Sequence, residues 1–196
     1  MTRFTRSFEE IRSGVPRLYE NKAIMNNKRH KVSKAQFAEV LYHWLSLSMT
    51  EKKINEKAKD FGFKIRNDND FNNIFAELLV FNMWLIVYTC EAVVDDKYKR
   101  NECLDIFHRF VYERHFYEKD QDFWSWMKSA LQKYQEYYTA RETEHPSTPL
   151  WVVAQLIIKN VLGENTNNLG ALIKIMAYQT LTFEHLATAL KDYDIE

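Results

Sequence analysis

Residues 71–94 constrain the fold of this chain more than any other feature. Apolar side chains recur there at helical spacing and cover nearly all sides of the helix. A helix that is apolar all round is buried by other helices at the centre of a bundle. Its longest apolar stretch, residues 78–90, is interrupted by Asn82 and falls short of the about twenty residues that cross a bilayer. We therefore expect a core helix of a soluble protein and no membrane contact.

The rest of the chain also favours helices. Four Gly and three Pro in 196 residues leave little turn punctuation, which argues against sandwiches, barrels and short hairpins. Helical periodicity and capping residues such as Ser33, Thr50, Asp70, Asp96 and Thr148 predict the helix boundaries. The predicted helices span about 33–48, 51–61, 70–94, 97–117, 122–142, 150–162 and 169–193, and Thr182 is an alternative N-cap within the last one. The predicted fold class is all-α, a single-domain bundle of about seven helices around a central hydrophobic helix.

The formal charge of zero hides an asymmetry along the chain. Residues 1–34 hold nine basic and three acidic side chains, whereas the remainder holds 18 basic and 24 acidic ones. We therefore divide the chain into a basic, partly flexible N-terminal arm (1–32) and a helical bundle domain (33–196). A basic arm binds nucleic acid or an anionic surface, or lies against its own acidic body. We favour a solvated or self-docked arm over nucleic-acid binding through residues 3–34, and expect the arm to be dispensable for the fold.

The cysteines and the N-terminus bear on the compartment. Cys90 and Cys103 stand at unrelated positions and do not form a disulfide framework. Residues 1–18 lack the uninterrupted apolar run of a secretory signal. We therefore expect buried, reduced thiols and a cytoplasmic protein.

The sequence also lacks several familiar catalytic motifs. It contains no glycine-rich phosphate loop and no Gly-x-Ser-x-Gly nucleophile elbow. Clustered glycines are needed for a backbone to approach a phosphate closely. We therefore expect no nucleotide cofactor, and we regard enzymatic activity as the less favoured interpretation.

A metal centre is one alternative. Glu39 and His43 are separated by one helical turn, as are Asp105 and His108, so that each pair shares a helix face. A carboxylate-bridged dimetal bundle needs Glu-x-x-His on two helices. This chain offers only one related motif, with Asp105 in place of Glu. A metal-dependent helical enzyme is therefore the weaker alternative, and we expect the purified protein to carry no stoichiometric metal.

The aromatic content is the remaining functional signal. The chain has five Trp, eleven Tyr and thirteen Phe, and a bundle core rich in large residues is the simplest explanation for them. On the helix predicted at 122–142, an inward stripe containing Leu131 leaves Trp126 and Tyr137 on a flank. Such surplus rings favour an oligomer interface or a pocket for a flat ligand. The candidate interface or ligand-lining residues are Trp124, Trp126, Tyr134, Tyr137, Tyr138 and Tyr112.

Three functions remain open at this point. We expect first a non-enzymatic cytoplasmic interaction protein that binds a protein partner or self-associates as a homodimer through an aromatic helix face. The second hypothesis is a helical pocket protein that binds an apolar or aromatic small molecule. The third is the metal-dependent helical-bundle enzyme that uses Glu39, His43, Asp105 and His108.

Overall fold

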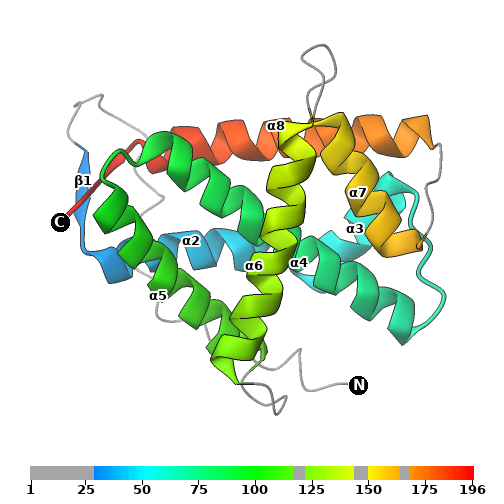
Figure 1. Ribbon diagram of the computed structural model, residues 1–196, viewed down its shortest axis with the longest axis horizontal. Coiled ribbons are helices and arrows are strands. Elements are labelled where there is room, and N and C mark those ends of the chain that lie inside the picture. Colours follow the sequence, from blue (N-terminus) through cyan, green and yellow to red (C-terminus); the bar gives the residue numbers. More distant parts are fainter. Residues whose placement is uncertain (1–28, 117–121, 144–149, 164–167) are drawn as a thin grey trace.

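A computed structural model describes residues 29–116, 122–143, 150–163 and 168–196 (Figure 1). Within these residues the chain forms seven helices and two three-residue strands. The elements are β1 (His30–Val32), α2 (Lys34–Ser48), α3 (Glu51–Phe61), α4 (Asp68–Val93), α5 (Lys97–His115), α6 (Phe123–Glu142), α7 (Trp151–Leu162), α8 (Leu169–Leu190) and β2 (Tyr193–Ile195). The all-α bundle predicted from the sequence is confirmed.

Capping residues explain most of the helix boundaries. The Ser33 side chain accepts from the backbone N–H of Gln36, and the Gln36 side chain accepts in return from the backbone of Ser33, which completes a capping box. The side-chain oxygens of Thr50 and Asp96 accept from the backbone N–H groups of Lys53 and Lys99 and so cap α3 and α5. Gly62 ends α3 with a φ of +76°, a conformation that costs glycine little.

Two predicted helix starts differ from the structure. The N-cap of α4 is Asn67, and the Asp70 carboxylate accepts instead from the backbone and side-chain nitrogens of Arg66, both at 3.0 Å. Helix α7 begins at Trp151 after Leu150, which has a φ of +70°. Thr148, the cap expected there, lies outside the described residues.

Helix α4 occupies the centre of the bundle, as predicted. It packs against each of the other six helices, and Met83, Trp84, Leu85 and Ile86 are all buried. Its buried Asn82 side chain donates to the carbonyl oxygen of Leu78 at 2.6 Å, which satisfies the amide within the helix.

Helix α4 also resembles a membrane-spanning helix in its length and composition. Of the helices in the described ranges, α4 is the one long and apolar enough to cross a membrane, and 72% of its most apolar window is buried by the protein. A core helix meets the same criteria of length and composition, so they give only weak support for a membrane span.

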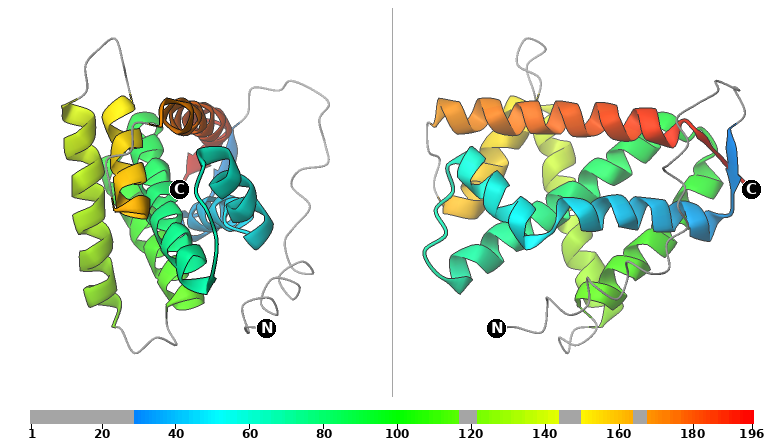
Figure 2. Two further views of the ribbon diagram at one scale, coloured as in Figure 1. Left: turned by 90° about the vertical axis from the view of Figure 1, so that its right-hand side faces the viewer. Right: turned by 180° about the vertical axis from the view of Figure 1, so that it is seen from behind.

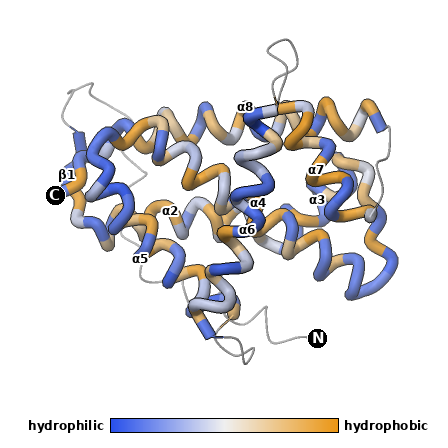
Figure 3. The backbone as a smooth tube through the Cα atoms, in the orientation of Figure 1, coloured by the Kyte–Doolittle hydropathy of each residue, from blue (hydrophilic) through white to orange (hydrophobic). Residues whose placement is uncertain are grey.

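The other helices enclose α4 from different sides. Figure 1 shows α6 crossing in front of α4, with α8 running along one edge of the bundle. The two further views place α6 and α7 on one side of the molecule and α2 and α3 on the other (Figure 2). Colouring by hydropathy shows apolar residues recurring along the whole of α8 (Figure 3). Helix α8 packs on α3, α4 and α7, which leaves its remaining face to solvent.

A small parallel sheet joins the two ends of the described chain. Strands β1 and β2 pair in the register His30 with Tyr193, Lys31 with Asp194, and Val32 with Ile195. The expectation that the last helix continues to about Tyr193 is wrong, because α8 ends at Leu190 and the chain then becomes extended. No helix break occurs at Thr182, whose side chain is buried within α8. Residues 30–32 of the predicted arm are part of the folded structure.

Candidate functional site

The aromatic face predicted on α6 is largely internal. Trp126, Tyr134 and Tyr137 are at most 5% exposed, so the expectation that Trp126 and Tyr137 lie on an outer flank is wrong. Leu131, expected inside, is 52% exposed. Helix α6 packs against α4, α5 and α7 together, and three neighbours bury a wider arc of its surface than a single inward stripe.

The other three candidates have different environments. Trp124 is 72% exposed, whereas Tyr138 and Tyr112 are half-buried. The hydroxyl of Tyr138 donates to the Glu91 carboxylate at 2.7 Å. The ring of Tyr112 contacts the rings of Phe123 and Trp126, with centroids 5.4 and 5.8 Å apart. Of the six candidates, Trp124 alone presents a largely solvent-exposed ring.

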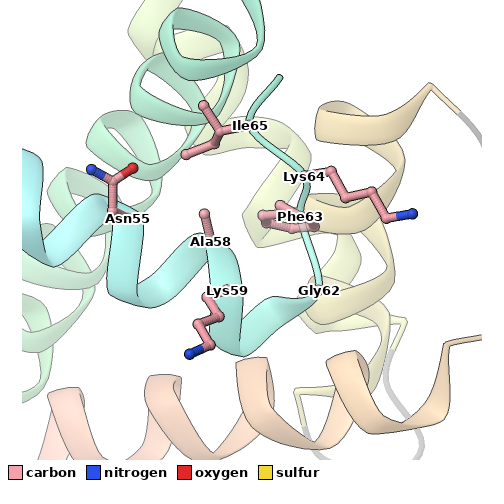
Figure 4. Close-up of a pocket in the computed structure, with 7 residues that line it drawn as sticks. All are labelled: Asn55, Ala58, Lys59, Gly62, Phe63, Lys64 and Ile65. Atoms are coloured by element: carbon pink, nitrogen blue, oxygen red, sulfur yellow. The ribbon is translucent and has the colours of Figure 1, made fainter. Parts of the chain in front are cut away.

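Two pockets in the described part of the chain are lined by residues other than these six aromatic side chains. The larger, of about 390 Å³, lies at the end of α3 beside Ala58, Phe63 and Ile65. Figure 4 shows that Lys59 and Lys64 point away from one another at its rim. The second, of about 170 Å³, lies between β2 and the turn from α4 to α5. A ligand site normally has polar groups that converge on the ligand, and the larger pocket lacks this feature.

The predicted metal ligands do not come together. Within the described ranges no group of three or more His, Cys, Asp or Glu side chains could hold a metal ion. Glu39 and Asp105 are exposed and His43 is half-buried. His108 is buried, with its Nε2 atom 3.1 Å from the hydroxyl oxygen of Tyr134. The structure therefore does not bring these four residues into one group of ligands.

Burial controls the protonation of the internal histidine and thiols. It lowers the pKa of His108 to about 4, against a smaller opposite effect of the Leu104 backbone carbonyl. It raises the pKa of the Cys90 thiol to about 12 and that of the Cys103 thiol to about 11. Both cysteines are free and buried. Neutral, buried thiols of this kind are poor nucleophiles.

A buried carboxylate connects α4, α6 and α7. The Oε1 atom of Glu77 accepts from the Tyr137 hydroxyl at 2.5 Å and from the Asn160 amide at 2.8 Å. The Lys133 ammonium lies 3.9 Å from the other carboxylate oxygen. Burial raises the pKa of Glu77, while the two hydrogen bonds and Lys133 act in the opposite direction. Its two hydrogen-bond donors come from α6 and α7, so the cluster joins these helices to α4.

A second polar cluster joins α2, α3, α4 and α8. The Lys57 ammonium donates to the Ser48 carbonyl oxygen at 2.9 Å and to the Tyr178 hydroxyl at 2.7 Å. That hydroxyl donates in turn to Asn82 at 2.5 Å. Most of this cluster has no signal in the sequence, apart from Asn82 within an otherwise apolar stretch.

Several of the large apolar side chains that are exposed in the described residues lie on the outer face of α8. Leu169, Ile173 and Leu181 are 57%, 55% and 53% exposed, and Ala177 between them is also exposed. These four residues recur every fourth position and define what we call the α8 outer face. Single exposed apolar residues are common on proteins, but a row of them along one helix is typical of a contact surface.

The chain matches no protein family, no curated protein and no solved structure. A function must therefore be inferred from the surfaces and buried clusters of the protein itself.

Proposed function

We propose that this protein is an interaction protein that forms a homodimer through the α8 outer face. The exposed row of Leu169, Ile173, Ala177 and Leu181 is the observation that carries the proposal. Burying such a row against a second protein removes large apolar side chains from water. The two buried cysteines are free thiols, which fits a reducing compartment such as the cytoplasm.

The pattern of the α8 outer face is self-complementary. Ile173 and Leu181 each stand four residues from Ala177, on opposite sides of it. When two copies cross antiparallel at Ala177, Ile173 of one copy faces Leu181 of the other, twice by symmetry. The small Ala177 side chain at the crossing point lets the two backbones approach closely. The row spans about 18 Å, at about 1.5 Å per residue.

The charges beside this row also favour an antiparallel crossing. Lys174 and Glu184 are the exposed charged residues nearest to the row. In the antiparallel arrangement Lys174 faces Thr180, and Glu184 faces Gly170, so that no like charges meet. In a parallel arrangement Lys174 faces Lys174 of the second copy and Glu184 faces Glu184, and these like charges repel each other. The charges beside the α8 outer face therefore favour a second copy of the chain as the binding partner.

Light scattering on the purified protein tests the proposal. The wild-type chain should have twice the 23.6 kDa mass of one chain, whereas Ala177→Glu should be monomeric because it places two carboxylates at the crossing point. Ala35→Glu is the matched control, since Ala35 is also exposed but lies on α2. A monomeric wild type, or a dimer that survives Ala177→Glu, contradicts the proposal.

A charge-pair exchange tests the antiparallel register. Ile173→Lys alone should weaken the dimer, because a lysine then faces Leu181 of the second copy. Adding Leu181→Glu should restore it, since each lysine then faces a glutamate. Trp124→Ala tests the α6 surface favoured by the sequence. If Trp124→Ala dissociates the dimer while the α8 variants do not, the contact surface is on α6.

A further inference from the structure

Lys57 differs from its neighbours in the partners of its ammonium group. Lys53 on the same helix pairs with the Glu56 carboxylate at 2.8 Å. Within the described residues, no carboxylate oxygen lies within 4 Å of the Lys57 ammonium, and its two hydrogen-bond acceptors are neutral. They are the Ser48 carbonyl of α2 and the Tyr178 hydroxyl of α8. Lys57 is thus held in position without a counter-charge.

This geometry suits a neutral amine. A neutral lysine has two N–H bonds and one lone pair, so its two hydrogens satisfy the two acceptors and the lone pair is left over. The Tyr178 hydroxyl gives its own proton to Asn82, which fixes it as an acceptor toward Lys57. Lys57 is half-buried, so its side chain is only partly hydrated.

The electrostatics act in the same direction. Burial lowers the pKa of Lys57 from 10.5 to about 8, and the positive charge of Lys53 on the same helix adds to this effect. The groups that face the ammonium from the other helices are the Ser48 carbonyl and Tyr178, whose ring centroid lies 4.6 Å from the nitrogen, and burial raises the pKa of Tyr178 to about 12. The ring favours the charged form and so acts against the effect of burial. At pH 7.5 the neutral fraction of such a lysine is roughly 200-fold larger than that of an ordinary one.

We propose that Lys57 is a nucleophilic amine that forms imines with small aldehydes. The nitrogen lone pair attacks the carbonyl carbon, and the electron pair of the C=O bond moves to the oxygen, which takes up a proton. The nitrogen loses its two protons overall, the C–O bond breaks, and the oxygen leaves as water. The product is a C=N bond to Lys57, and the reaction needs no oxidant or reductant.

Reductive alkylation of the native protein tests this reactivity. Acetaldehyde is added with sodium cyanoborohydride, which reduces each imine to an N-ethyl lysine, and the modified lysines are mapped by peptide mass spectrometry. Lys57 should be ethylated at least about tenfold faster than Lys53 at pH 7.5, because more of it is neutral. Its rate should level off above pH 8, where the amine becomes fully neutral.

Two outcomes would overturn the proposal. One is a Lys57 rate no higher than that of Lys53; the other is a rate at Lys57 that still rises above pH 10. Lys57→Arg is the matched variant, because a guanidinium still donates to the Ser48 carbonyl but forms no imine under these conditions. The rapid modification of the α3 peptide should disappear in this variant. If the α3 peptide is still modified rapidly in Lys57→Arg, another amine is the reactive group.

Discussion

At the scale of single residues, Trp84 shows how the core is built from rings. It is fully buried, and its ring centroid lies 5.3–6.0 Å from those of Phe81, Tyr88, Tyr137 and Tyr138. Its indole N–H has no hydrogen-bond partner among the described residues. An unpaired buried donor loses its bond to water without replacement, so packing must outweigh that cost.

Trp84→Ala should therefore lower the free energy of unfolding by about 3–5 kcal/mol, through the loss of a large core side chain. Trp84→Phe is the control: it keeps a ring and removes the unpaired N–H, so its loss should be clearly smaller. Urea denaturation followed by circular dichroism measures both. A loss below about 1 kcal/mol for Trp84→Ala would be inconsistent with a core position.

His108 should make the stability depend on pH. Its pKa is about 4 in the folded protein and 6.5 without burial, so the unfolded chain binds more protons between these values. The contribution of the neutral histidine is therefore complete above pH 6.5 and is lost as the pH falls from 6.5 toward 4. Urea denaturation across this range should show a shallower pH dependence for His108→Gln than for the wild type.

The matched control for this measurement is His185→Gln, since His185 is exposed on α8. Its pH dependence should follow the wild type. Parallel curves for all three proteins would show that His108 is not the titrating group.

At the scale of elements, the helices follow local chemistry while the small sheet does not. The side chains of Ser33, Thr50 and Asp96 accept hydrogen bonds from backbone N–H groups three residues ahead, and the sequence alone identifies them as caps. Strand β1 instead depends on residues at the other end of the chain. The backbone N–H of His30 donates to Asp192 at 2.7 Å, and that of Glu196 donates to Val32 at 2.9 Å.

Comparing two truncations isolates the contribution of β1. Removal of residues 1–32 should lower the melting temperature by about 3 °C or more relative to removal of residues 1–28, because it deletes the partner of β2 and uncovers Ile195. Differential scanning calorimetry measures the difference. Equal melting temperatures would show that β1 adds nothing to stability, as the sequence analysis expected for the whole arm.

At the scale of the whole molecule, one apolar helix organises the fold. Helix α4 is enclosed by six others, and their outward faces are what the protein offers to partners. Among these faces, the α8 outer face combines exposed aliphatic residues with a pattern that fits a second copy of itself. The aromatic residues, by contrast, serve mainly as core.

Dimerisation should couple stability to protein concentration. If two copies associate when folded, mass action raises the melting temperature as the concentration of the wild-type protein increases. Ala177→Glu should remove this dependence, while Ala35→Glu on α2 should retain it. A melting temperature independent of concentration in the wild type, over a range that spans the dissociation constant, would contradict the dimer.

Local sequence patterns were sufficient to predict the seven helices of the described residues and the central position of α4, although not every helix boundary. Capping and helical periodicity depend on residues within about four positions of one another, so both can be read along the chain. For the same reason the sequence identified the apolar segment that the other helices surround.

The tertiary structure alone decided which side chains face inward, and which meet. Periodicity gives an inward stripe but not the number of neighbouring helices, and three neighbours of α6 bury Trp126 and Tyr137. Lys57 meets Tyr178 across 121 positions of sequence, and His30 pairs with Tyr193 at the other end of the chain. Contacts between distant residues depend on how the helices pack, which no local pattern encodes.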